Sequence, residues 1–259
     1  SDAERTIFFD RTLPHMCALA LRLPALFPSG VPLLLRGRAR DVDLTAEQCG
    51  CLMAHAFFCT FPGRLVAPED AAQPTRTAAP PAGAPLLPYF SWVYLHGEGA
   101  LSDPTMLQKW RCLLGYFDAR ALRAASADAD AHASRTVTFT RLVGDTSELS
   151  LTGSNDGAWS ECDAPLCDVR ASASGVIEDA PAGTLQLDFA NRRVGGGVLR
   201  HGCVMEEIRF LCCPELVVAR LLAEELADNE ALLIRGFDTY SKHTGYAGSF
   251  RHAGPARPE

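Results

Sequence analysis

The chain has 259 residues, of which 47% are hydrophobic and 21% charged, the balance of an ordinary globular protein. It contains no run of 18 or more apolar residues and no basic-then-apolar leader, so neither a membrane span nor a signal segment is expected. The net charge of -7 argues against a sequence-independent grip on DNA or RNA, which needs a basic face. A local basic site for a phosphorylated ligand is compatible with it. Because the chain opens on Ser1, we interpret it as part of a longer protein.

Ten cysteines raise the question of a disulfide framework or a metal site. No C-x-x-C pair occurs, and no Cys/His set has zinc-finger spacing. Several cysteines stand inside apolar runs, as Cys59 and Cys212 do, and buried free cysteine behaves as a small hydrophobe. We therefore expect reduced core thiols, a reducing compartment and no bound metal.

The first half of the chain predicts helices joined by loops. Residues 13–23 are rich in Leu and Ala and stop at Pro24. Thr45 and Gln48 form a capping box ahead of a buried helix at 51–61. Residues 67–88 carry many prolines and alanines and few large side chains, which predicts a surface loop or linker. A further helix is expected to start at residues 102–104.

The second half predicts strands and helices in alternation. Residues 136–142 and 184–189 alternate in polarity like strands, and residues 145–165 are polar and looped. Residues 206–212 and 214–226 read as helices, and residues 231–234 form a short apolar strand. A strand, a glycine loop, a helix and a strand in this order predict a βαβ unit with parallel pairing.

Three consecutive glycines follow the second predicted strand closely: Gly195, Gly196 and Gly197. Without Cβ atoms, they let the backbone approach a ligand, and consecutive N–H groups make a concavity for an anion such as a diphosphate. For an isolated triple glycine, a flexible turn is the more common explanation. Neither a dinucleotide-binding fingerprint nor a Walker A loop fits, because Arg200 stands where the third fingerprint glycine is needed and no G-K-[ST] follows.

Two adjacent carboxylates, Glu206 and Glu207, open the helix that follows the glycines. Neighbouring helical residues point about 100° apart, so the two side chains are expected to have different tasks. One addresses a substrate in this hypothesis, and the other holds sugar hydroxyls or the neighbouring loop. A favourable acidic first turn, explained by the helix dipole alone, is the alternative.

Taken together, the order of five motifs resembles the poly(ADP-ribose) glycohydrolase family. The motifs are DFAN, VGGGV, EEIRF, PEL and TGYA, and similarity extends upstream to AHAFFCTFP and TVTFTR. The resemblance covers nearly all of the chain. It implies an α/β fold, namely a macrodomain-like α/β/α sandwich with a mixed sheet, preceded by a helical accessory region. We expect the accessory region at residues 1–134 and the macrodomain-like catalytic region at residues 135–259.

The resemblance also implies roles for the residues that match the family motifs. Glu207 corresponds to the catalytic acid/base, and Glu206 to the glutamate that orients the ribose hydroxyls. Asn191 corresponds to an asparagine that contacts the same ribose. Glycosidic cleavage passes through an oxocarbenium-like state and needs a proton on the leaving oxygen. From the sequence, we expect burial and the neighbouring Glu206 to favour the protonated form of Glu207.

The remaining implied roles concern the nucleotide. Gly195 to Gly197 match the loop beside the diphosphate, Ile177 and Glu178 match the adenine-reading pair, and Tyr246 matches a tyrosine that stacks on adenine. Met205 stands where the family signature has Gln, so one polar contact is lost. The family continues past TGYA with further strands and a second glycine loop, so we expect the C-terminal part of the catalytic region to be missing here.

The function implied is hydrolysis of ribose–ribose O-glycosidic bonds in poly(ADP-ribose), with release of ADP-ribose and no cofactor or metal. An inactive relative that binds ADP-ribose, or a fragment without turnover, is the alternative. The implied partners are poly(ADP-ribose) and ADP-ribosylated proteins. Sequence-specific nucleic acid and membrane are not expected as partners. The implied locations are nucleus and cytoplasm, in the DNA damage response.

Overall fold

The computed structural model describes residues 2–61, 85, 87–88, 90–92, 103–144, 163–165, 167–181 and 183–256. The chain divides into two compact units, one of residues 1–143 with 190–259 and one of residues 144–189. Most of the predicted Pro/Ala-rich loop at 67–88 and of the polar loop at 145–165 lies outside the described residues.

Helices dominate the described part of the first 143 residues. They are α1 (Asp2–Ile7), the π-helix η1 (Phe8–Thr12), α2 (Leu13–Leu21), α3 (Leu23–Leu26), α4 (Ala46–Phe57), α6 (Pro104–Ala124) and α7 (Ala129–Ser134). The predicted capping box starts α4, because the Thr45 side chain accepts from the N–H of Gln48 and the Gln48 side chain accepts from the N–H of Thr45. Asp103 caps α6, as the predicted start at residues 102–104 requires.

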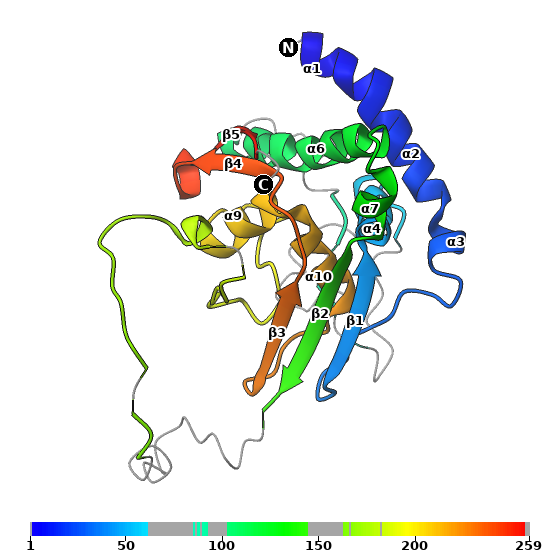
Figure 1. Cartoon of the computed structure of the whole chain (residues 1–259). Coiled ribbons are helices and arrows are strands. Elements are labelled where there is room, and N and C mark those ends of the chain that lie inside the picture. The colour runs from blue at the N-terminus through cyan, green and yellow to red at the C-terminus, as the bar shows by residue number, and fades with distance from the viewer. Residues whose placement is uncertain are drawn as a thin grey trace. The chain divides into compact units, whose positions relative to one another are not determined.

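Three strands form one antiparallel sheet in the order β1 (Arg40–Thr45), β2 (Thr136–Val143), β3 (Glu230–Arg235) (Figure 1). In the central strand, Phe139 lies opposite Val42 on one side and Ile234 on the other. The alternation predicted for this strand is confirmed, because Val137, Phe139 and Arg141 are buried while the residues between them are less so. β1 belongs to the region predicted at residues 1–134 and β2 to the region predicted at 135–259, so the two predicted regions share one sheet.

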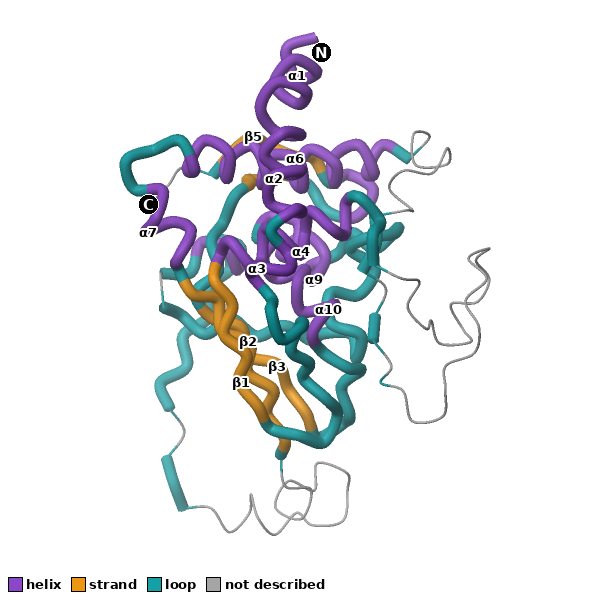
Figure 2. The backbone as a smooth tube through the Cα atoms, turned by 90° about the vertical axis from the view of Figure 1, so that its right-hand side faces the viewer, coloured by secondary structure: helices purple, strands orange, loops and turns teal. Residues whose placement is uncertain are grey.

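The helices of the first 143 residues gather toward one end of the three strands (Figure 2). The chain connections explain this arrangement, because β1 runs directly into α4 and α7 runs directly into β2. The last third of the chain adds α9 (Met205–Cys212), the 3-10 helix η5 (Pro214–Val218) and α10 (Ala219–Leu222). A two-stranded sheet of β4 (Ser241–Thr244) and β5 (Arg251–Pro255) follows, with η6 (Ala247–Ser249) between its strands.

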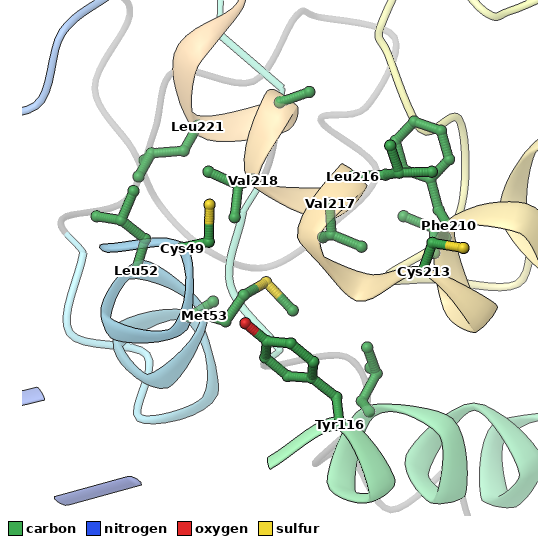
Figure 3. Packing of buried hydrophobic residues seen from close by; sticks show 14 of the residues in the cluster. Cys49, Leu52, Met53, Tyr116, Phe210, Cys213, Leu216, Val217, Val218 and Leu221 are labelled. Carbon is green, nitrogen blue, oxygen red and sulfur yellow. The ribbon is translucent and has the colours of Figure 1, made fainter. Parts of the chain in front are cut away.

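The core joins the helical region to the segment that follows α9. Side chains of α4 face those of η5 and α10, with Tyr116 of α6 beside them, as Figure 3 shows for Cys49, Leu52, Met53, Val217, Val218 and Leu221. All of these side chains are at most 1% exposed. Nine cysteines among the described residues are free thiols and six of them are buried, as expected of core cysteines. The segment from 214 to 222 is therefore held rigidly against α4.

The parallel pairing predicted for a βαβ unit is wrong. β3 pairs antiparallel with β2, and its first residue, Glu230, lies opposite Val143, the last residue of β2. The only parallel contact among the described residues is an isolated bridge between Leu34 and Ala223. A turn after α10 leads the chain into β3 from the end where β2 stops, so the two strands run in opposite directions.

The strand predicted at residues 184–189 is also absent. These residues belong to the unit of residues 144–189 and adopt no strand pairing. Their apolar side chains are exposed, at 78% for Leu185, 68% for Leu187 and 87% for Phe189. Alternation alone does not make a strand, because the backbone groups need a neighbouring strand to bind. The helix predicted at 214–226 is shorter than expected, since it begins as η5 and α10 ends at Leu222.

Arg141 joins the sheet to the segments around residues 34 and 224–225. Its guanidinium donates to the backbone oxygens of Leu34, Glu224 and Glu225 and pairs with the carboxylate of Glu230. Both side chains of the ion pair are fully buried. All the donor capacity of this buried cation is thus used, which keeps its desolvation tolerable. Within the described residues, no helix is both long and apolar enough to cross a membrane.

Candidate active site

Glu206 and Glu207 stand in the first turn of α9, and both are buried, with 7% and 6% exposure. The two carboxylates bind different parts of the preceding loop. Oε1 of Glu206 accepts from the N–H of Gly195 at 2.6 Å, and its Oε2 accepts from the N–H of Asn191 at 3.1 Å. Both carboxylates therefore hold the same loop through different amides, and the expected division of tasks between substrate and loop stays a prediction.

Glu207 closes the start of its own helix while it also reaches the glycine loop. Oε2 accepts from the N–H of Val204, the residue before α9, at 2.9 Å. Oε1 accepts from the N–H of Gly197, also at 2.9 Å. The helix start satisfies one of its own open backbone donors in this way, which fixes the side chain in one rotamer. The carboxylate is therefore held on both oxygens by backbone amides.

Two glycines of the triplet are needed for different reasons. Gly195 has φ +82°, and a Cβ there would lie 3.0 Å from the ring of Phe210. Gly196 has φ +46°, and a Cβ there would collide with Oε1 of Glu207 and lie 3.0 Å from Oε2 of Glu206. The two carboxylates thus converge on the bare α-carbon of Gly196.

A fourth glycine, Gly202, completes this arrangement and was not singled out from the sequence. A Cβ on Gly202 would lie 2.7 Å from the Cα of Gly197 and 2.5 Å from Oε1 of Glu207. The N–H of Gly202 donates to the carbonyl of Gly197 at 3.1 Å, so the loop closes on itself here. The short distance in sequence between the triplet and Gly202 is the signal that could have identified this glycine.

The amides of the glycine loop bind anions, but the anions are the protein's own carboxylates. The N–H groups of Gly195 and Gly197 donate to Glu206 and Glu207, and that of Gly196 donates to the carbonyl of Arg193. The prediction of an anion-binding turn fits the chemistry of these groups. In this conformation, however, the same three amides are not available to a diphosphate.

Two buried cations bind the carbonyl side of the loop. Nζ of Lys109, a residue of α6 with no exposed surface, donates to the carbonyls of Val198 at 3.1 Å, Arg200 at 2.6 Å and also Gly202. Nη1 of Arg220 in α10 donates to the carbonyls of Val194 and Gly196, each at 2.8 Å. Burial lowers the pKa of Lys109 to about 8, while the nearby Cys203 and Glu207 act in the opposite direction.

Tyr246 is brought to this site by the loop between β4 and β5. The N–H of the next residue, Ala247, donates to the carbonyl of Cys203 at 2.9 Å, only one residue before Val204. The Tyr246 side chain is 55% exposed, and its backbone is fixed by hydrogen bonds with the Ser249 side chain. An exposed ring on a fixed backbone is suited to stacking on a flat ligand.

Two family models of known proteins match this chain. A family model described as "Poly (ADP-ribose) glycohydrolase (PARG), helical domain" matches residues 1–141. A second, described as "Poly (ADP-ribose) glycohydrolase (PARG), Macro domain fold", matches residues 157–258. The chain belongs to the poly(ADP-ribose) glycohydrolase family. The predicted α/β fold class, a helical region ahead of a macrodomain-fold region, is confirmed by the same matches.

Individual family members match either nearly the whole chain or a part of it. Poly(ADP-ribose) glycohydrolase 1 of Arabidopsis thaliana is 32% identical over 269 residues, which cover 98% of this chain and 43% of the plant protein. Poly(ADP-ribose) glycohydrolase 1 of Caenorhabditis elegans is 50% identical over 78 residues, or 30% of this chain and 10% of that protein. The chain thus spans less than half the length of the curated relatives that it matches.

The family-derived site residues fall into two groups in the structure. Glu206, Glu207, Asn191, Tyr246 and the three glycines all belong to one compact unit. Asn191 contributes its backbone N–H to Glu206, while its side chain accepts from the N–H of Arg193. Met205 is half-buried as the first residue of α9.

Ile177 and Glu178 belong to the unit of residues 144–189. They form the 3-10 helix η4 (Ile177–Asp179), whose preceding Val176 N–H is bound by the carboxylate of Asp179. Their predicted place beside the adenine of a poly(ADP-ribose) glycohydrolase substrate stays a prediction. No group of three or more His, Cys, Asp or Glu side chains suited to a metal ion occurs among the residues that the structure describes.

Besides Gly202, sequence reasoning missed two buried cations of the site in this family member, Lys109 and Arg220. Arg220 is the single charged residue between Glu215 and Glu224, inside an otherwise apolar run. Lys109 follows Met106 and precedes Leu113 at helical spacing, on the buried stripe of α6. A lone cation on an apolar face was the available signal, because such a side chain needs buried oxygen partners.

Proposed function

We propose that this chain hydrolyses ribose–ribose O-glycosidic bonds of poly(ADP-ribose) and releases ADP-ribose. The observation that carries the proposal is the pair of hydrogen bonds that holds the Glu207 carboxylate against the glycine loop. A general acid is effective only when it is held in one place and partly removed from water, and both conditions are met by Glu207. Membership of the poly(ADP-ribose) glycohydrolase family supports the same substrate class.

In the proposed reaction, Glu207 acts first as an acid and then as a base. Its carboxyl proton passes to the oxygen that joins the two riboses, and the bond from that oxygen to the anomeric carbon breaks. The resulting carboxylate takes a proton from a water molecule, whose oxygen forms the new bond to the anomeric carbon. Glu207 ends as it began, and one water is consumed. Acid/base catalysis of this kind contributes about 10² to 10⁴ in rate.

Glu206 and Asn191 have supporting roles in the proposal. Glu206 links Asn191 to Gly195 through its two oxygens, so it joins the start of the loop to the glycine turn. A carboxylate has more acceptor positions than the two that these amides use, so Glu206 can also accept from ribose hydroxyls. Tyr246 is proposed to stack on the adenine, with Ile177 and Glu178 reading its edge. Nuclear and cytoplasmic location belongs to the same proposal.

The test is release of ADP-ribose from automodified polymer by the parent chain and by Glu207→Gln. Glutamine keeps the size and one carbonyl oxygen of the side chain but cannot give up a proton, so turnover is expected to fall by about a hundredfold or more. Glu4→Gln, which changes an exposed glutamate of α1, is the matched control and is expected to keep full activity. Equal activity of Glu207→Gln and the parent would refute the role of Glu207.

A second candidate function is binding of ADP-ribose without turnover. Met205 favours it, because a thioether replaces the polar Gln of the family signature one residue before the two glutamates. Calorimetry with ADP-ribose separates the two functions when it is combined with the release assay. Binding without release supports the second candidate, and release by the parent chain excludes it. Thermal unfolding with and without ADP-ribose detects either form of binding, since a ligand of the folded state raises Tm.

A further inference from the structure

Arg220 contacts the glycine loop but has no role in the proposed reaction as described above. It stands on α10 with 5% exposure, and a single nitrogen, Nη1, donates to two backbone oxygens of the glycine loop. Those oxygens belong to Val194 and Gly196, which alternate with the two amides that bind the glutamates. A terminal guanidinium nitrogen such as Nη1 carries two N–H groups in fixed directions, so it can donate to two carbonyls at a fixed spacing.

The planarity of the peptide bond connects these oxygens to the two glutamates. The carbonyl of Val194 shares a peptide unit with the N–H of Gly195, and the carbonyl of Gly196 shares one with the N–H of Gly197. In a trans peptide, the C=O and N–H of one unit point in opposite directions. The two N–H groups donate to Glu206 at 2.6 Å and to Glu207 at 2.9 Å. Each peptide unit therefore lies between the guanidinium of Arg220 and one carboxylate.

The position of Arg220 is itself fixed by its surroundings. A Cβ on Gly195 would lie 3.3 Å from Cδ of Arg220, so the arginine stem packs directly over this glycine. The carbonyl of Leu222, at the end of α10, accepts from the N–H of Leu34 at 2.8 Å. On either side of Arg220, Val218 and Leu221 are buried against α4 (Figure 3). The guanidinium thus reaches the loop from a rigid base.

We propose that Arg220 is a positioning residue for the glycosidic reaction. It sets the direction of the Gly195 and Gly197 amides, and through the second of these it sets the place of the Glu207 carboxylate. Its charge also polarises the two peptide units and strengthens their N–H groups as donors. Arg220 touches no substrate in this scheme, and the inference rests on the proposed function.

The first experiment compares the kinetics of Arg220→Lys with those of the parent chain on poly(ADP-ribose). Lysine keeps the charge but not the planar fork, so the two peptide units lose their common anchor. We expect kcat to fall about 10- to 100-fold while KM changes less than about threefold, because misplacement of a catalytic group acts on the chemical step. Arg209→Lys is the matched control, since Arg209 is a half-buried arginine of α9 that faces the ring of Phe237. It is expected to leave both constants unchanged.

A double-mutant cycle separates positioning from general structural damage. If Arg220 acts through Glu207, Arg220→Lys combined with Glu207→Gln is no slower than Glu207→Gln alone, within about threefold. Losses that multiply would overturn the proposal, because Arg220 would then act independently of Glu207. Full kcat in Arg220→Lys would overturn it as well. A parent chain that releases no ADP-ribose counts against the proposed function itself and removes this inference with it.

A measurement without turnover covers the case in which the variant is poorly active for other reasons. Amide protons that donate to a carboxylate resonate downfield, so the Gly195 and Gly197 signals report their bonds to the glutamates directly. In ¹H–¹⁵N correlation spectra, the proton shifts of both amides are expected to move upfield in Arg220→Lys and to stay in place in Arg209→Lys. Unmoved signals in a folded Arg220→Lys chain would overturn the proposal.

Discussion

The backbone N–H of Gly197 donates a 2.9 Å hydrogen bond to Oε1 of Glu207, ten residues further along the chain. This contact joins the two motifs that the sequence shows separately, a glycine triplet and a pair of acids at a helix start. Because Gly196 has no Cβ, the carboxylate of Glu207 can lie next to its α-carbon. The catalytic hypothesis therefore depends on the absence of a side chain as much as on the presence of one.

Gly196→Ala is expected to remove activity out of proportion to its effect on stability. The new methyl group meets Oε1 of Glu207, which can yield only by leaving the Gly197 amide. We expect turnover to fall by about a hundredfold, as for loss of the acid itself. The positive φ should cost about 1–2 kcal/mol of stability. Gly30→Ala is the control, because Gly30 also has a positive φ, +82°, but a methyl group there meets nothing within 4 Å. Similar activity losses in both variants would contradict the proposed crowding of Glu207.

Lys109→Met is expected to destabilise the fold by about 2–4 kcal/mol, because buried carbonyls of residues 198, 200 and 202 lose their donor. For a chain of this size, each kcal/mol lowers Tm by roughly 2–4 °C. Lys242→Met, which changes the exposed lysine of β4, is the matched control and should leave Tm nearly unchanged. Calorimetric unfolding of the three chains checks the prediction. Equal Tm values for the parent and Lys109→Met would show that the carbonyls find other donors.

The buried pair of Arg141 and Glu230 predicts a specific loss of stability in acid. Burial by itself raises the pKa of Glu230, but hydrogen bonds from Arg141 and from the N–H groups of Ala227 and Gly37 outweigh it and lower the pKa to about 2. Between the ordinary value of 4.5 and this one, the unfolded chain binds more protons than the folded chain. The contribution, about 3 kcal/mol, is therefore complete above pH 4.5 and disappears as pH falls through about 2.

Glu230→Gln checks this contribution. At pH 7, the variant is expected to be about 3–5 kcal/mol less stable than the parent in urea unfolding, since the Arg141 charge stays buried without a partner. The gap between the two chains should narrow at pH 3, and Glu4→Gln should show no such gap at either pH. A constant difference across this range would mean that Glu230 stabilises the fold by packing and not by its charge.

Tyr246→Ala is expected to weaken ADP-ribose binding without unfolding the chain. The ring is 55% exposed, so its removal from the free protein should change stability little. Loss of stacking on a base should cost about 1–3 kcal/mol, or roughly 5- to 150-fold in Kd by calorimetry. Tyr246→Phe keeps the ring and should bind nearly as well as the parent. Unchanged affinity in Tyr246→Ala would exclude this tyrosine from the adenine site.

Local features of the fold were predictable because their causes lie within a few residues. The capping box of Thr45 and Gln48 needs only two side chains and two amides at fixed spacing. The alternation in β2 and the acidic start of α9 are equally local. The exposed segment at 184–189 shows the limit of this reasoning, because it has the same alternation as β2 but lacks a neighbouring strand.

Local sequence patterns are enough to identify the chemical groups that this protein brings to its site: bare glycines, two acids at a helix start and a tyrosine in the TGYA segment. The partners of those groups depend on how the chain folds in three dimensions. The amides expected to face a diphosphate hold Glu206 and Glu207, and the cations that bind the loop carbonyls, Lys109 of α6 and Arg220 of α10, come from two other helices. Glycine and glutamate patterns are encoded locally, whereas the partner of a buried carbonyl or cation is chosen by packing, which joins distant segments.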